Sequence, residues 1–134
     1  MNAIADTGFL VAFLNRADQH HQWATTLADD VTVPLICCEP VLTEAAYLVG
    51  SVPLVMSLLA SGLVEIAFDL EDNRSHVTDL AERYADRRPD LCDLCVVRLS
   101  ELFPNHKVIT TDREDFRVYR RNKRETIPLI CPPE

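Results

Sequence analysis

The sequence has no long apolar run, little glycine and a shortage of basic side chains, and each shortage excludes a class of protein. No stretch approaches the roughly 20 apolar residues that a membrane helix needs, and the N-terminal residues do not resemble a secretory signal peptide. Only three of the 134 residues are glycine, and neither a repeat nor a glycine-serine linker divides the chain. We therefore expect one soluble, cytoplasmic domain over residues 1–134, with no membrane partner.

Basic side chains are outnumbered by acidic ones, with 13 Lys and Arg against 21 Asp and Glu and a net charge of −8. This balance argues against a protein that coats nucleic acid through bulk electrostatics. Six of the 13 basic residues nevertheless fall within residues 113–124. Such a run is ordinarily a solvated surface, but it also predicts a local contact with an RNA backbone, with Arg113 and Arg117 as candidate substrate-binding residues.

The five cysteines do not form the even, regularly spaced set that a small disulfide-stapled domain requires. Cys92 and Cys95 interleave with Asp90 and Asp93 in the stretch RPDLCDLCVVR, residues 88–98. On a helix, at about 100° per residue, the two aspartates share one side and the two cysteines lie nearly opposite. We therefore expect the cysteines in the core and not in a zinc or redox site. Four apolar residues share the cysteine side: Leu91, Val96, Leu99 and Leu102.

Apolar segments of strand length alternate with longer segments of helical periodicity. Strands are predicted at residues 2–6, 34–38, 63–68, 107–111 and 127–130. Helices are predicted at residues 9–15, 18–28, 39–49, 52–60, 72–87 and 91–102. This order predicts an α/β fold with a central, mostly parallel sheet of four to five strands and helices on both faces.

Acidic residues recur where this fold would place the carboxyl edge of its sheet, which is the usual ligand site in such folds. Asp6 and Asp112 end two predicted strands, Glu44 lies on the helix after a third, and Asp90 and Asp93 begin a helix. Alone, Asp6, Asp90 and Asp112 have a simpler interpretation as a turn or a helix cap, and Asp93 as an acid favoured by the helix dipole. Together they predict a site for Mg²⁺ or Mn²⁺, which relieves the repulsion between clustered carboxylates and supports phosphodiester chemistry.

Four segments carry a resemblance to a known family: IADTGFLVA at residues 4–12, VLTE at 41–44, PDLCDLCVV at 89–97 and VITTDREDF at 108–116. In this order and with these gaps, the sequence resembles the PIN-domain ribonucleases, and among them the VapC-type toxins of toxin–antitoxin pairs. The resemblance spans most of the chain and implies a PIN-like three-layer α/β/α fold.

The resemblance also implies a set of site residues. The catalytic quartet would be formed by four acids: Asp6, Glu44, Asp93 and Asp112. Of these, Asp6 and Asp93 match the positions most directly tied to the cation, with Asp90, Asp112 and Asp115 as further candidate ligands. Asp90 and Asp115 match additional acids of the family, and Thr7 and Thr111 match hydroxyls that hold water or phosphate.

The function implied is that of a Mg²⁺- or Mn²⁺-dependent endoribonuclease whose substrate is RNA. As a toxin, it would have a protein antitoxin that covers the active site, and it would form a homodimer. Two alternatives remain open at this point. The chain could be a free-standing PIN nuclease that acts in RNA processing, or a non-catalytic PIN-like binding module.

Overall fold

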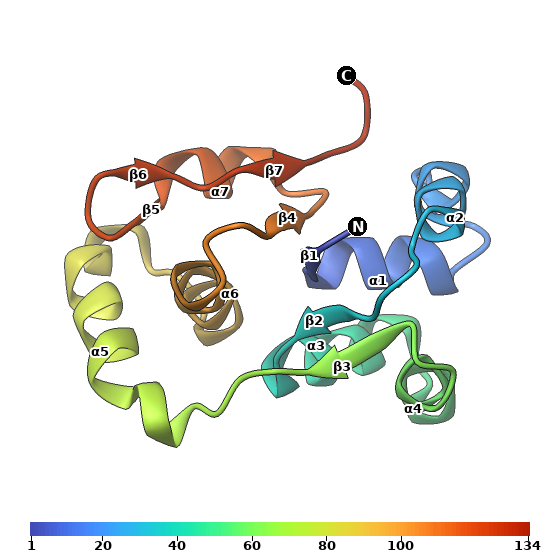
Figure 1. Ribbon diagram of the computed structural model, residues 1–134, viewed down its shortest axis with the longest axis horizontal. Coiled ribbons are helices and arrows are strands. Elements are labelled where there is room, and N and C mark those ends of the chain that lie inside the picture. Colours follow the sequence, from blue (N-terminus) through green and yellow to red (C-terminus); the bar gives the residue numbers. More distant parts are fainter.

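Five parallel strands form the central sheet of the protein, in the order β3-β2-β1-β4-β7 (Figure 1). The structure, a computed structural model, describes residues 1–134. The strands are β1 (Ala3–Ala5), β2 (Leu35–Cys37), β3 (Val64–Ile66), β4 (Lys107–Ile109) and β7 (Leu129–Ile130). Helices flank this sheet, so the predicted α/β fold with a parallel sheet of four to five strands is confirmed.

The central strands are short and apolar because both of their faces are covered. In β1 the register pairs Ile4 with Ile36 of β2 on one side and with Val108 of β4 on the other. All residues of β1 and β2 are buried, as is typical of parallel strands between two layers of helix. The parallel order also brings the carboxyl ends of β1, β2 and β4 to one edge, which positions the candidate site.

The structure has seven α-helices, of which the first six follow the predicted alternation with differences at their ends. They are α1 (Thr7–Leu14), α2 (His21–Asp29), α3 (Glu39–Val49), α4 (Val52–Ala60), α5 (Arg74–Arg83), α6 (Leu91–Leu102) and α7 (Arg113–Val118). The helix predicted from residue 18 begins only at His21, because Asp18 Oδ1 accepts a hydrogen bond from the His20 backbone N–H in a preceding turn. The helix predicted over 72–87 is divided into α5 and two flanking 3-10 turns, η1 (Glu71–Asn73) and η2 (Ala85–Arg87).

The segment between β4 and β7 holds structure that the sequence pattern did not predict. Helix α7 is followed by a two-stranded antiparallel hairpin, β5 (Arg120–Arg121) and β6 (Glu125–Thr126). Its turn contains Asn122 and Lys123, both with positive φ. The segment is rich in charged residues, so neither helical nor strand periodicity of apolar residues marks it.

Helix α6 crosses the core with the orientation that its sequence predicts for the cysteines. Cys92 and Cys95 are buried, and Val96 and Leu99 beside them are fully buried. The predictions for Leu91 and Leu102 were wrong, because these two terminal residues of the helix project beyond the packed layer and Leu91 is 49% exposed. No helix in the structure is long and apolar enough to cross a membrane.

Candidate metal centre

An acidic cleft of about 470 Å³ opens at the carboxyl edge of the sheet. Its lining includes every acid that the sequence singled out: Asp6, Glu44, Asp90, Asp93, Asp112 and Asp115. Thr7 and Thr111, the two predicted hydroxyl residues, line it as well. Four segments far apart in the sequence supply these side chains: the β1–α1 junction, α3, the start of α6, and the β4–α7 junction. The fold therefore gathers the acids into one site, as the parallel topology predicts.

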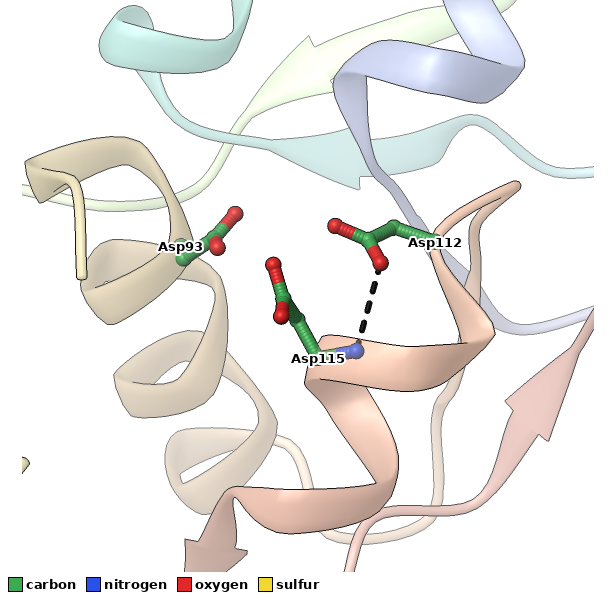
Figure 2. A group of neighbouring side chains, drawn as sticks. All are labelled: Asp93, Asp112 and Asp115. Atoms are coloured by element: carbon green, nitrogen blue, oxygen red, sulfur yellow. Dashed lines mark hydrogen bonds between the residues drawn. The ribbon is translucent and has the colours of Figure 1, made fainter. Parts of the chain in front are cut away.

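Three of these carboxylates lie close enough to share one ion (Figure 2). Asp93, Asp112 and Asp115 each offer an oxygen atom, and the three atoms lie within 4.8 Å of one another. Asp93 comes from the first turn of α6, and the other two come from the start of α7. Carboxylate oxygens are the ligands that Mg²⁺ and Mn²⁺ prefer, so the three aspartates could hold a divalent metal ion.

Asp6 is the most deeply placed acid of the cleft, with only 4% of its surface exposed. The Thr110 hydroxyl donates a hydrogen bond of 2.6 Å to its Oδ2 atom. The pKa of Asp6 is raised to about 6, mainly by burial and to a smaller extent by the negative charges of Glu44 and Asp112, whereas the hydrogen bonds from the Thr110 hydroxyl and the Thr7 backbone lower it. These two donors favour the charged form of this buried carboxylate.

The pKa of Asp93 is raised by burial and by the negative charges of neighbouring acids. Burial is the main cause that raises its pKa to about 8, followed by the charges of Asp90, Asp6 and Asp112. Burial also raises the pKa of Asp112. Acids with such pKa values in one cleft indicate uncompensated negative charge, which a bound divalent cation would offset. The donor set and its electrostatics therefore fit Mg²⁺ or Mn²⁺.

Two of the acids also cap helices, Asp90 as its simpler interpretation predicted and Asp112 where a turn was predicted. Asp90 Oδ1 accepts a hydrogen bond of 2.7 Å from the Asp93 backbone N–H at the start of α6. Asp112 Oδ1 accepts one of 3.2 Å from the Asp115 backbone N–H at the start of α7. Each cap uses one carboxylate oxygen, so capping and metal binding are compatible at both residues.

The predicted hydroxyl residues are packed by close neighbours. The Thr7 hydroxyl lies 3.4 Å from the Cys92 sulfur, which ties the start of α1 to the start of α6. A Cβ atom on Gly8 would overlap the hydroxyl of Thr111, so residue 8 must lack a side chain for these two loops to approach. Thr110, which binds Asp6, was missed because the strand pattern alone did not show which of two adjacent threonines points to the acid.

The two predicted basic residues do not line the cleft. Arg113 donates a hydrogen bond of 2.9 Å to the Pro132 carbonyl, and Arg113 and Arg117 lie 3.6 and 3.7 Å from Glu134 Oε1. Another arginine of the basic run, Arg121, is only 8% exposed and donates to the carbonyls of Ser100 and Pro104. The contacts of Arg113 and Arg117 attach α7 to the C-terminal residues, and those of Arg121 attach β5 to the end of α6 and the residues after it.

Sequence reasoning missed several polar neighbours of the acids. Asp18, Gln19 and His20 line the cleft from the turn before α2. Arg87, in η2, places its guanidinium 3.7 Å from Asp115 Oδ1 and is the basic residue that pairs with an acid of the cleft. No sequence pattern places the turn before α2 or Arg87 beside the acids, because both placements depend on how loops fold back over the sheet edge.

The group of side chains that could hold a metal ion contains no cysteine. Cys37, Cys38, Cys92 and Cys95 are buried free thiols, and Cys131 is half-buried. Burial raises the pKa of Cys37 to about 12, and it also raises the pKa of Cys92. Thiols held in this neutral form behave as small apolar side chains, which agrees with the predicted core role.

Comparison with protein-family models finds none that matches the chain, and comparison with curated proteins finds no match either.

Proposed function

We propose that the protein is a Mg²⁺- or Mn²⁺-dependent endoribonuclease of the PIN-domain type. The observation that carries the proposal is the convergence of six acids from four segments on one cleft, with three carboxylate oxygens within 4.8 Å of one another. The four motifs that resemble PIN-domain ribonucleases supply these same residues. The resemblance and the geometry thus support one site by independent routes.

The donor set defines which residues would hold the cation. Asp93, Asp112 and Asp115 offer three neighbouring oxygens, and Asp6 lines the same cleft. When bound, Mg²⁺ or Mn²⁺ would supply positive charge that polarises a water molecule and neutralises the attacked phosphate. We assign direct contact with the cation to Asp93 together with Asp6, Asp112 or Asp115, in keeping with the motif match.

Glu44 orients the attacking water by accepting a hydrogen bond from it. The Thr110 hydroxyl favours the charged form of the Asp6 carboxylate, which is the form that would contact the cation. The attacking water gives up a proton to a carboxylate of the cleft as its oxygen forms a bond to phosphorus, while the bond from phosphorus to the 3′-oxygen breaks. The leaving 3′-oxygen takes up a proton from solvent, so the products carry a 5′-phosphate and a 3′-hydroxyl. No covalent enzyme intermediate is required.

A test of this chemistry uses single-stranded RNA, Mn²⁺ and EDTA. We expect cleavage with Mn²⁺, none with EDTA, and a loss of at least about 100-fold in the variant Asp6→Asn. Asp79→Asn is the matched control, because Asp79 is an exposed acid on α5 outside the cleft. Cleavage that persists in EDTA, or full activity in folded Asp6→Asn, would refute the proposal.

The resemblance to VapC-type toxins supports a biological role in a toxin–antitoxin pair. In this role a protein antitoxin covers the cleft and places an arginine among the carboxylates, where it competes with the cation. Leu48, Val52, Leu54 and Met56 are exposed apolar residues on α3 and α4 and are our candidates for a homodimer surface. Growth arrest on induction, absent in Asp6→Asn, is the expected result; normal growth with an active enzyme would instead favour a free-standing nuclease.

A further inference from the structure

A second cavity, of about 770 Å³, adjoins the acidic cleft and is called here the side pocket. It lies between α3, the segment after β3 and the start of α6. Glu44 and Asp90 line both the side pocket and the acidic cleft, so the two spaces share a wall. A single strand whose phosphate lies in the cleft can therefore extend a neighbouring nucleotide into the side pocket. Its volume is within the range of about 300–1,000 Å³ that is typical of ligand pockets.

Part of the lining of the side pocket is apolar. Tyr47, on α3, is 84% exposed, and Leu91, at the start of α6, is 49% exposed. Phe68 and Leu70, from the segment after β3, and Cys92 complete the hydrophobic part of the lining. Exposed aromatic rings beside a phosphate-binding site are the usual stacking platforms for the bases of single-stranded RNA.

The polar lining of the side pocket offers hydrogen-bond acceptors and no cationic side chain. Four carboxylates lie there, those of Glu39, Glu44, Asp69 and Asp90, and neither lysine nor arginine is present. Asp69 Oδ1 and Asp90 Oδ1 each accept a backbone N–H, which leaves one oxygen on each for a ligand. The Glu39 carboxylate has no hydrogen-bond partner within the chain, although its backbone carbonyl accepts from Thr43. This lining repels phosphate and selects an uncharged ring that donates hydrogen bonds.

We propose that the side pocket binds a nucleobase with an exocyclic amino group, adenine, cytosine or guanine, next to the scissile phosphate of the RNA. Tyr47 stacks on the base, and the Glu39 carboxylate accepts from its amino group, as acidic residues do when they bind the amino group of cytosine. The position of this base relative to the cut rests on the proposed function, whereas base binding itself does not. The side pocket would then be a determinant of sequence specificity.

Nucleosides test base binding without phosphate or metal. The probes are adenosine, and purine riboside as its matched analogue without the amino group, each titrated in EDTA while backbone amide shifts are followed by NMR. We expect shifts at Thr43 and Leu91 and an affinity for adenosine about fivefold above that for purine riboside. Tyr47→Ala should weaken adenosine binding by about tenfold, and Tyr47→Phe should preserve it. Glu39→Ala should abolish the preference for adenosine, and Glu65→Ala, at an exposed acid on β3, should not.

Absence of shifts, equal affinity for the two nucleosides, or an unchanged affinity in Tyr47→Ala would overturn the proposal. If light scattering then shows a dimer that Tyr47→Ala dissociates, the occupant is a second copy of the chain. A second experiment compares the cleavage of a random-sequence RNA pool by wild type and Tyr47→Ala. We expect wild type to show a base preference at one fixed distance from the cut, and Tyr47→Ala to lose it. A wild-type protein that binds adenosine and cuts no RNA would refute the proposed function and leave base binding in place.

Discussion

The Thr110 hydroxyl and the Asp6 carboxylate form the shortest polar link between β4 and the start of α1, a hydrogen bond of 2.6 Å in a fully buried setting. Thr110 also accepts the Asp112 backbone N–H at 2.9 Å, so one hydroxyl connects two acids of the cleft. This residue contributes no ligand to the proposed cation. It acts on the site by fixing the position and the charge of its neighbours.

We predict that Thr110→Val weakens Mn²⁺ binding and destabilises the fold. The hydrogen bond lowers the pKa of Asp6, so its loss should favour the protonated, non-binding carboxyl group. Loss of one buried hydrogen bond to a charged group should cost about 1–3 kcal/mol of unfolding free energy. Isothermal titration and urea unfolding measure the two effects, and Thr110→Ser is the control that keeps the hydroxyl. Equal Mn²⁺ affinity in Thr110→Val would show that Asp6 does not depend on this donor.

The pH dependence of stability without metal follows from the raised pKa values of two acids. The pKa of Asp6 is about 6 and that of Asp93 about 8, both above the ordinary 3.8, so the folded state binds more protons than the unfolded state between about pH 4 and pH 8. Stability should therefore fall as pH rises through this range. For the buried Asp6 alone the effect is on the order of 3 kcal/mol.

Urea unfolding at pH 5 and pH 8 in EDTA measures this dependence. The double variant Asp6→Asn/Asp93→Asn should have a flatter profile and should be more stable than wild type at pH 8. Addition of Mn²⁺ at pH 8 should raise the stability of wild type and not that of the variant, because the cation binds the deprotonated carboxylates. A wild-type protein that gains stability from pH 5 to pH 8 in EDTA, relative to the variant, would contradict the assigned pKa shifts.

The triad of Asp93, Asp112 and Asp115 predicts that two neighbouring acids of α7, Glu114 and Asp115, differ in their contribution to Mn²⁺ binding. Asp115→Asn should reduce Mn²⁺ affinity by about tenfold or more, because its oxygen lies within 4.8 Å of those of Asp93 and Asp112. Glu114→Gln, one residue earlier on α7, is the control, since Glu114 is exposed and lies outside the cleft. Equal losses in both variants would indicate a general charge effect and no specific site.

The sequence predicted the sheet and the acids because both depend on strong local signals. Short apolar segments alternate with amphipathic ones, and parallel strands must present their carboxyl ends at one edge, so the positions of Asp6 and Asp112 followed from topology. The cap at Asp90 followed from the proline before it and the helix after it. These features require no knowledge of how distant loops pack.

The parts that could not be predicted depend on tertiary contacts between polar segments. Helix α7 and the β5–β6 hairpin lack an apolar period, and their positions depend on contacts such as those of Arg121 with the carbonyls of Ser100 and Pro104. For the same reason the sequence did not show that Arg113 and Arg117 pair with Glu134 of the C-terminal segment, and their contact with substrate stays a prediction. A charged residue in the sequence indicates that its side chain needs a polar partner, but the sequence does not identify that partner.

The cysteines provide a test of the buried core of α6. We expect a thiol reagent to modify native protein at Cys131 first, because this residue is half-buried and the other four are buried. The four buried thiols should react only at the rate of unfolding, with or without EDTA. Mass spectrometry over time counts the modified sites. Rapid reaction of Cys92 and Cys95, accelerated by a chelator, would instead support a metal-binding thiol pair.

The substitution Gly8→Ala tests whether tertiary packing or helix propensity dominates at this position, because the two predict changes in stability of opposite sign. Gly8 lies in the first turn of α1, where alanine ordinarily stabilises a helix by up to about 1 kcal/mol. In this protein an added Cβ would overlap the Thr111 hydroxyl, so we expect Gly8→Ala to destabilise the fold by about 1–3 kcal/mol. Urea unfolding measures the change. Gly8→Ala/Thr111→Ala should recover part of the loss, because the nearest remaining atom, Thr111 Cβ, lies 3.1 Å from the added carbon. If Gly8→Ala is instead as stable as wild type, the close approach of the β1–α1 and β4–α7 junctions, which brings Asp6 and Asp112 into one cleft, does not hold in solution.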